Sequence, residues 1–217
     1  MTLTLGIDEA GRGPVIGPMV MAGVVVTEEQ TEQLRNIGVK DSKLIPPRIR
    51  EDMFEMIKKI VTSYKIIIIP PKEIDDALES PDLNLNKLEA LKSALIINEL
   101  KPEKAILDAP SINTKAYEDQ VKFYLKNKDI IFVTENKADL NYIEVGAASI
   151  LAKVTRDAEI EKIRKKYGEI GPGYPSNPIT QAFLKQNWEK HPEIFRKTWE
   201  TYKKIARAKS QKELGEY

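Results

Sequence analysis

The chain opens on an alternation of apolar and polar positions that predicts a β-strand. Within residues 2–8, Leu3, Leu5 and Ile7 alternate with small or polar residues, the period of a strand with one buried face. This period places Asp8 on the face opposite the leucines. A second acid and a glycine-rich run, residues 11–18, follow directly. We therefore expect the first strand to end in two adjacent acids and a turn.

Later patterns predict a second strand and then alternating helices and strands. Residues 19–26 are apolar in both phases, which favours a central strand antiparallel to the first. Thr27 and Gln30 fit a helix capping box, with a stop near Gly38, and Pro47 suits the first turn of the next helix. The remaining expected elements are strands over 65–70, 105–108 and 129–134, an acidic loop after residue 70, and helices over 47–61, 88–100, 114–127, 141–167, 178–189 and 193–212.

This order of elements, a hairpin followed by β-α-β-α-β-α, predicts an α/β fold with a mixed sheet covered by helices. The length of 217 residues suits one core with a small appendage. No apolar run is long enough to span a bilayer, and the N-terminus lacks a secretion signal, so we expect an intracellular, cytoplasmic protein without a membrane partner.

Composition narrows the chemistry. The absence of cysteine excludes disulfides, zinc-thiolate sites and a thiol nucleophile, and the single histidine, His191, lies in a charged stretch typical of a surface. The net charge of +1 conceals two basic segments. Residues 153–166 carry six Lys or Arg against three acids, and residues 185–217 carry nine against five. Such segments fit a protein that grips a polyanion, although ordinary solvated helices have the same surplus.

Carboxylates at strand ends are the main candidates for catalysis. Asp108 ends the fourth strand and Asp139 follows the fifth, while Asp8 and Glu9 end the first. If these strands are parallel neighbours, their ends place four acids at one edge of the sheet, where they repel one another unless divalent cations are bound. Oxygen ligands without histidine or cysteine select Mg²⁺ or Mn²⁺, and two such ions suit phosphodiester hydrolysis.

Each acid also has a simpler interpretation. The first pair fits an exposed acidic turn, and Asp139 fits a helix cap. Neighbours on a regular strand point to opposite faces, so Glu9 joins Asp8 only if the strand breaks there. Otherwise the main-chain carbonyl of Glu9 would contribute in place of its side chain.

Five motifs in order resemble those of the ribonuclease HII family, in its archaeal form. They are DEAGRGP (8–14), KDSK (40–43), LDAP (107–110), KADLNYIEVGAASILAKVTRD (137–157) and GYPSNP (173–178). The resemblance implies a ribonuclease H-like five-stranded sheet, with the first three strands antiparallel and the rest parallel. It further implies a catalytic domain over residues 1–168 and a C-terminal helical, substrate-binding region over 169–217.

The resemblance also implies a function and a set of site residues. The enzyme would be an endoribonuclease acting on RNA–DNA hybrids and on ribonucleotides embedded in duplex DNA, cutting 5′ of the ribonucleotide to leave a 3′-hydroxyl and a 5′-phosphate. Such an activity would serve DNA replication and repair. The implied residues are Asp8, Glu9, Asp108 and Asp139 for two metal ions; Gly11, Arg12 and Gly13 for the 2′-hydroxyl; Tyr174 for the next sugar; and Lys43 and Lys153 for phosphates.

Simpler interpretations remain for these substrate-contacting residues and for the function of the whole protein. Tyr174 could pack among the C-terminal helices, and each lysine could be a solvated surface residue. A resolvase-type nuclease on the same fold would not need a 2′-hydroxyl, and a nucleic-acid-binding module would have purely structural acids. We expect the enzyme to be a monomer.

The C-terminal tail resembles a short motif that binds a protein partner. Gln211, Leu214 and Tyr217 are spaced as Gln-x-x-Leu-x-x-aromatic, which resembles the peptide that binds DNA sliding clamps. In a 3₁₀ turn the leucine and the tyrosine would form one apolar pair. The alternative is a frayed chain end without a partner.

Overall fold

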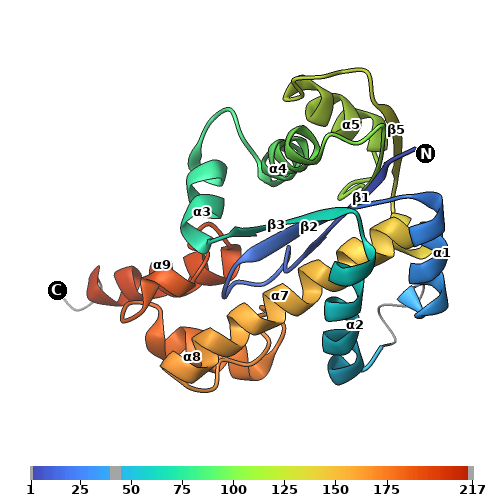
Figure 1. Cartoon of the computed structure of the whole chain (residues 1–217). Coiled ribbons are helices and arrows are strands. Elements are labelled where there is room, and N and C mark those ends of the chain that lie inside the picture. The colour runs from blue at the N-terminus through green and yellow to red at the C-terminus, as the bar shows by residue number, and fades with distance from the viewer. Residues whose placement is uncertain (1, 40–44, 215–217) are drawn as a thin grey trace.

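A five-stranded sheet runs through the middle of the protein, whose computed structural model describes residues 2–39 and 45–214, with side chains to residue 208 (Figure 1). The strand order is β3-β2-β1-β4-β5. β2 is antiparallel to both β1 and β3, whereas β4 is parallel to both β1 and β5, as predicted. The strands are β1 (Thr4–Ala10), β2 (Met19–Val26), β3 (Ser63–Ile69), β4 (Lys104–Asp108) and β5 (Ile131–Glu135).

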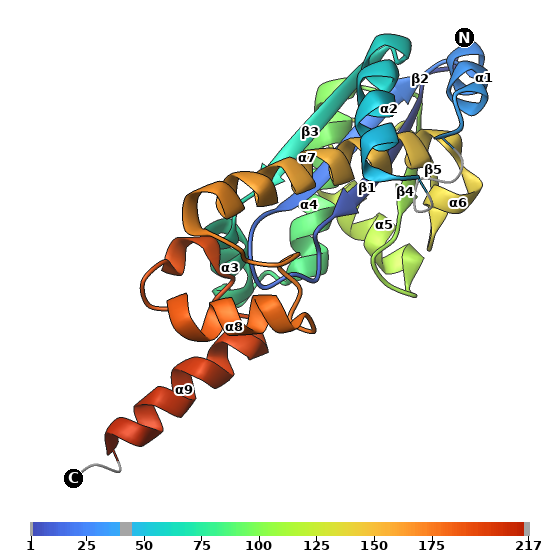
Figure 2. The ribbon, with the colours of Figure 1, turned by 90° about the horizontal axis from the view of Figure 1, so that it is seen from below.

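One face of the sheet is covered by α7 (Ile143–Tyr167), with α1 (Glu28–Asn36) and α2 (Pro47–Ile60) beside it (Figures 1 and 2). The predicted capping box of Thr27 and Gln30 is present at the start of α1. α7 crosses β1 so closely that a Cβ on Gly6 would lie 2.3 Å from the carbonyl carbon of Glu144. β1 is therefore buried on both faces, and the prediction of a half-buried strand is wrong, because a glycine at position 6 makes room for the helix.

The other face is covered by α4 (Leu85–Leu100), α5 (Thr114–Phe123) and α3 (Pro71–Glu79). α3 occupies the segment for which an acidic loop was expected. It begins at a proline, which suits the first turn of a helix, and buries Ile74 and Ala77 in the core of this face. The acids around these two residues obscure the helical spacing in the sequence.

The segment between β5 and α7 is broken rather than continuous. A short helix, α6 (Ala138–Asn141), precedes α7, and Tyr142 between them is extended. The Tyr142 hydroxyl donates a hydrogen bond to Glu135 at 2.7 Å, which fixes the break. The expected start of one long helix near residue 141 is therefore replaced by two helices with a corner between them.

The C-terminal segments pack against the end of α7 and the loop after β1. They comprise α8 (Pro178–Asn187), a 3₁₀ turn over Pro192–Ile194, and α9 (Glu200–Leu214), which projects from the body in Figure 2. The helix expected over 193–212 begins only at Glu200, because Phe195 pairs with Ile16 in a β-bridge. α9 also continues to residue 214, past the point where fraying was expected.

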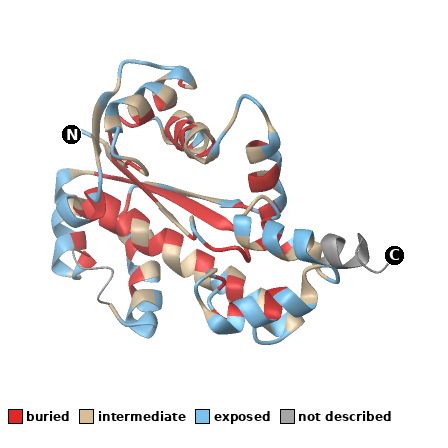
Figure 3. Cartoon of the chain, turned by 180° about the vertical axis from the view of Figure 1, so that it is seen from behind, coloured by how far each residue is buried: buried red, intermediate tan, exposed pale blue. Residues whose placement is uncertain are grey.

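Burial follows these layers, with the most buried positions on the central strands and on the inner side of α7 (Figure 3). No helix within the described ranges combines the length and the apolar character needed to cross a bilayer.

Candidate active site

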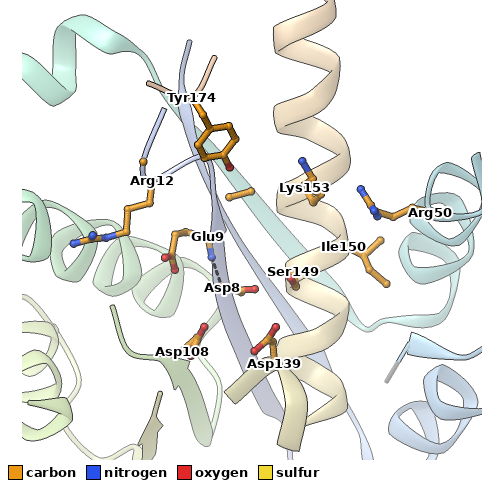
Figure 4. A pocket seen from close by; sticks show the side chains of 13 residues that line it. Asp8, Glu9, Arg12, Arg50, Asp108, Asp139, Ser149, Ile150, Lys153 and Tyr174 are labelled. Carbon is orange, nitrogen blue, oxygen red and sulfur yellow. Dashed lines mark hydrogen bonds between the residues drawn. The ribbon is translucent and has the colours of Figure 1, made fainter. Parts of the chain in front are cut away.

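A pocket of about 430 Å³ opens where the C-terminal ends of β1 and β4 meet α6 and α7 (Figure 4). Nine of the sequence-predicted site residues line it: Asp8, Glu9, Gly11, Arg12, Gly13, Asp108, Asp139, Lys153 and Tyr174. Its other lining residues are Ala10, Arg50, Ser149 and Ile150. Lys43 and Tyr217, and the side chains of Gln211 and Leu214, lie outside the described residues.

The parallel pairing of β1 and β4 brings two of the acids together. Ile7 pairs with Leu107, so Asp8 and Asp108 are the next residues on adjacent strands. The Asp108 carboxylate accepts a hydrogen bond from the main-chain N–H of Ala138 at 2.9 Å. This bond holds the first turn of α6, where Asp139 is buried one residue further on. The sheet edge thus gathers the acids of three segments.

Glu9 reaches the pocket without a break in the strand. β1 remains regular to Ala10, so the break that would have brought the side chains of Glu9 and Asp8 to one face is absent from this strand. Asp8 lies beside Ser149 of α7, and Glu9 turns toward the side of the pocket where Arg12 lies (Figure 4). Both line the pocket because they stand at the end of the strand, where neither face is fully covered.

The electrostatics of the pocket favour bound cations. Burial, followed by repulsion from Glu9 and Asp108, raises the pKa of Asp8 well above its usual range. Burial, with repulsion from Glu89 and Asp108, raises the pKa of Glu9 to about 8. A divalent ion would relieve both effects, because it compensates the negative charge that burial leaves without solvent.

The acids that line the pocket offer carboxylate oxygens as metal ligands, and hard divalent cations prefer such oxygens. Over the part of the chain that the structure describes, no three acidic or histidine side chains lie close enough together to hold an ion as they stand. The four acids line the pocket from different sides, as Figure 4 shows.

The side chain of Arg12 is bound to the protein itself. Its Nε donates to Glu89 at 2.8 Å and its Nη2 to Asn86 at 2.7 Å, both on α4. Glu89 is almost fully buried, and this burial raises its pKa to about 7 although Arg12 opposes the rise. Sequence reasoning missed Glu89, whose signal is a single acid among the apolar residues of α4.

The carbonyl groups of the Gly11–Gly13 turn are held from the C-terminal segment. The buried Arg196 donates to the carbonyls of Gly11 at 2.5 Å, Arg12 at 2.8 Å and Gly17 at 3.1 Å. The indole N–H of Trp199 donates to the carbonyl of Gly13 at 3.0 Å. Among the described residues, none accepts a hydrogen bond from the N–H of Arg12 or Gly13. The turn is thus fixed through its carbonyls while two of its N–H groups remain available.

Tyr174 lies against this turn and not among the C-terminal helices. A Cβ on Gly13 would be 3.8 Å from its ring, and the guanidinium of Arg156 lies 5.4 Å from the ring centroid. The preceding Gly173, at φ +85°, accepts a hydrogen bond from the N–H of Val15 at 2.8 Å. These contacts place the half-exposed ring at the pocket, beside the Gly11–Gly13 turn.

Sequence and structure comparisons agree on one family. The profile described as Ribonuclease HII matches residues 5–202. Ribonuclease HII of Pyrococcus furiosus is 48% identical over 205 residues, 92% of this chain and 89% of that protein. The crystal structure of ribonuclease H2 from Pyrococcus horikoshii OT3 superposes with a TM-score of 0.87 at 44% identity, covering 95% of this chain and 98% of that one.

A further solved structure is the PCNA:RNase HII complex from Archaeoglobus fulgidus. It matches with a TM-score of 0.82 at 36% identity, covering 91% of this chain and 95% of that one. Since the profile spans nearly the whole chain and the relatives match it at high identity along almost their full lengths, the protein belongs to the ribonuclease HII family of metal-dependent hydrolases.

Proposed function

We propose that this protein hydrolyses the RNA strand of RNA–DNA hybrids and cuts duplex DNA on the 5′ side of embedded ribonucleotides, leaving 3′-hydroxyl and 5′-phosphate ends. The observation that carries the proposal is a single pocket lined by four carboxylates, a glycine turn and an exposed tyrosine. Carboxylates alone would suit any metal-dependent nuclease. The turn and the tyrosine add groups that can examine the sugars on either side of the cut.

Asp8, Glu9, Asp108 and Asp139 would hold two divalent cations, which we propose to be Mg²⁺ or Mn²⁺. When bound, such ions activate a water and stabilise the charge on the leaving oxygen. The protein's own contribution is to keep the acids in place. The bond from Ala138 orients Asp108, and the side chain of Ser149 lies against Asp8.

We assign the reading of the 2′-hydroxyl to the N–H groups of Arg12 and Gly13. Main-chain groups of a glycine turn can approach a ligand closely, and a 2′-hydroxyl can accept from an N–H. The Arg12 side chain would act indirectly, by tying the turn to α4. Tyr174 would pack on the following sugar, where a 2′-hydroxyl would collide with its ring.

We further propose a division of labour along the chain. Residues 1–168 would carry out catalysis, and residues 169–217 would help to hold the substrate. The support is that, among the described residues from 169 onward, Tyr174 lines the pocket while Arg196 and Trp199 donate hydrogen bonds to the Gly11–Gly13 turn, and the four acids all precede residue 169. We also propose that the protein acts as a monomer, because its own residues supply the four acids, the glycine turn and the tyrosine that the proposed reaction needs.

The test uses a labelled DNA duplex containing one ribonucleotide beside an all-DNA duplex of the same sequence, each with Mg²⁺. We expect a single cut 5′ of the ribonucleotide and none in the control. Cutting of both duplexes would favour a resolvase-type nuclease, and cutting of neither duplex would favour a binding module.

The Asp108→Asn variant, which keeps the shape of the side chain but removes its charge, should still bind the duplex, and its cleavage rate should fall by about three orders of magnitude. Cleavage near the wild-type rate would remove Asp108 from the metal site.

We also propose that the tail residues Gln211, Leu214 and Tyr217 bind a DNA sliding clamp. The support is their motif spacing and the similarity of the chain to the ribonuclease HII of the Archaeoglobus fulgidus complex with PCNA. Calorimetric titration of the host's clamp into the full chain and into a chain ending at Ser210 tests this. We expect binding by the full chain alone, and equal binding by both chains would refute the motif.

A further inference from the structure

The segment that anchors the glycine turn (Gly11–Gly13) is itself held by α3, which lies beside the start of α9 in Figure 1. Arg196 and Trp199, at the two ends of the segment 196–199, donate to carbonyls of the turn. Between them, the buried carboxylate of Asp75 accepts three hydrogen bonds. The donors are the N–H of Lys197 at 2.8 Å, and the N–H and the hydroxyl of Thr198 at 2.9 Å and 2.6 Å. Asp75 therefore fixes the middle of the segment whose ends hold the turn.

The other side of the turn is held by α4, through the side chain of Arg12. This side chain donates to Glu89 and Asn86, on the side of the turn that faces away from α7 (Figure 4). Glu89 is 1% exposed, and its second oxygen, Oε2, is buried with no hydrogen-bond partner in the described part of the chain. An acid buried in this way lowers stability relative to an apolar residue of similar volume. Its presence therefore indicates a role at the turn and not in the fold.

The two helices form one unit. The ammonium group of Lys92 on α4 makes an ion pair with Glu73 of α3, and the lysine side chain is 13% exposed. Apolar residues of both helices belong to the same core on this face of the sheet. The α3–α4 pair therefore reaches the glycine turn at two places, once with each of its buried acids, Asp75 and Glu89.

Both acids also act on Arg196, the residue that binds the carbonyls of the turn. Burial and then the neighbouring Arg156 lower the pKa of Arg196 to about 9, whereas Asp75 and Glu89 oppose this fall. A buried guanidinium is costly unless opposite charge lies close to it. The α3–α4 pair therefore supplies negative charge for the anchor as well as hydrogen bonds for the segment that carries it.

We infer that Asp75 and Glu89 are positioning residues for the ribonucleotide, because together they hold the glycine turn in the place where it meets the 2′-hydroxyl. The inference rests on the proposed function, in which N–H groups of this turn read that hydroxyl. Neither acid touches the reacting groups directly: Asp75 acts through the segment 196–199 and Glu89 through Arg12. A misplacement of about 1 Å costs a reaction up to about 10²-fold in rate, so a weaker hold on the turn should be measurable.

Two other roles for these acids would have different effects. In a purely structural role, each acid contributes to the free energy of unfolding and leaves the turn unchanged in the folded protein. In an electrostatic role, the charge of Glu89 acts on Glu9, whose pKa burial and then this charge raise. Loss of the charge would then change the Mg²⁺ concentration that cleavage requires. A positioning role instead changes the mobility of the turn and the maximal rate.

Hydrogen exchange at the turn tests the inference directly. The reporters are the N–H groups of Val15 and Gly17, which donate to main-chain carbonyls at 2.8 Å and 2.9 Å. Exchange is measured where every variant is folded. Asp75→Asn and Glu89→Ala should each speed exchange at these groups about tenfold, because the loss of a hydrogen bond to a charged group makes local opening easier.

The matched control is Glu118→Gln. Glu118 is a mostly buried acid of α5, with a side chain 15% exposed, that accepts hydrogen bonds from Lys122 and Thr134 and does not line the pocket. Its substitution should leave exchange at Val15 and Gly17 unchanged, even where it lowers the melting temperature as much as Asp75→Asn does. Unchanged exchange in the Asp75 and Glu89 variants, or equal acceleration by the control, would overturn the inference.

Cleavage separates the positioning role from the two others. Single-turnover rates are measured at saturating protein on the duplex containing one ribonucleotide, over a series of Mg²⁺ concentrations. Asp75→Asn and Glu89→Ala should lower the maximal rate about tenfold and keep the Mg²⁺ concentration at half-maximal rate within about twofold. A full maximal rate despite faster exchange would refute the positioning role.

The conservative variant Glu89→Gln tests whether geometry or charge matters at this position. Glutamine keeps an oxygen that accepts from Arg12, so it should restore most of the rate that Glu89→Ala loses. A shifted Mg²⁺ requirement, or no rescue by glutamine, would show that Glu89 acts through its charge and would remove it from the hold on the turn.

Thermal melts check that each variant folds. If Asp75→Asn does not fold, Thr198→Val replaces it, because this change removes only the hydroxyl that donates to Asp75 at 2.6 Å and should speed exchange to a smaller extent. If Glu89→Ala does not fold, Glu89→Gln replaces it in the same way. A wild-type protein that does not cut the duplex would refute the proposed function, while the exchange rates would still decide whether the two acids hold the turn.

Discussion

Replacing Arg196 with lysine tests whether the turn is held through its carbonyls. The guanidinium makes three hydrogen bonds, to the carbonyls of Gly11, Arg12 and Gly17, and it is fully buried. A lysine keeps the charge, but its single nitrogen cannot reproduce a planar fork with three directions. At least two bonds should be lost. At about 1.5–3 kcal/mol for each charge-assisted bond, Arg196→Lys should lower the free energy of unfolding by about 3–6 kcal/mol.

The assay combines urea unfolding with single-turnover cleavage of the duplex containing one ribonucleotide, at a temperature where the variant is folded. Arg35→Lys is the control, because Arg35 forms an exposed i,i+3 pair with Glu32 and should change stability by less than about 1 kcal/mol. We also expect the folded variant to cleave more slowly, since the turn is loosened. A loss of stability below about 1 kcal/mol, or a full cleavage rate in the folded variant, would contradict the role assigned to Arg196.

Three other predictions follow from the site and the sheet. Because the pKa of Glu9 is raised from 4.5 to about 8, the folded metal-free protein binds a proton at Glu9 more tightly than the unfolded chain does. The free energy of unfolding should therefore fall as the pH rises from about 5 to 8. Urea unfolding at a series of pH values measures this fall, and a Glu9→Gln variant that keeps the full pH dependence would exclude Glu9 as its cause. The Tyr174→Ala substitution should reduce the cleavage rate about tenfold more on one embedded ribonucleotide than on a continuous hybrid, because a ring stacked on the substrate is worth about 1–3 kcal/mol. Rates measured in parallel on the two substrates test this, and equal reductions would leave Tyr174 a purely structural role. The Gly6→Ala substitution should lower the free energy of unfolding by about 3 kcal/mol, because the added Cβ would lie 2.3 Å from the main chain of Glu144. A melting temperature equal to that of the wild type would show instead that α7 can move away from β1 at little cost.

The alternation of apolar residues predicted the strands of the sheet, and the acids at the ends of these strands predicted that they would meet at one edge. Asp8 and Asp108 could be paired in advance, because the ends of parallel neighbours meet at one edge. The arrangement around the turn could not be predicted in this way. Arg12 looked like a substrate contact, yet its partner Glu89 lies 77 residues away and carries no local signal. Likewise, α3 was hidden because its two buried residues, Ile74 and Ala77, are surrounded by acids.

The anchoring of the turn by Arg196 has a consequence for synthesis of the protein. Arg196 follows Arg12 by 184 residues, so the group that fixes the turn is synthesised long after the turn itself. A nascent chain that has already formed β1 and β4 carries Asp8, Glu9 and Asp108 but not Arg196. Synthesis therefore supplies the strands that carry these acids well before the group that holds the Gly11–Gly13 turn, and the turn reaches its final form only after Arg196 has been added.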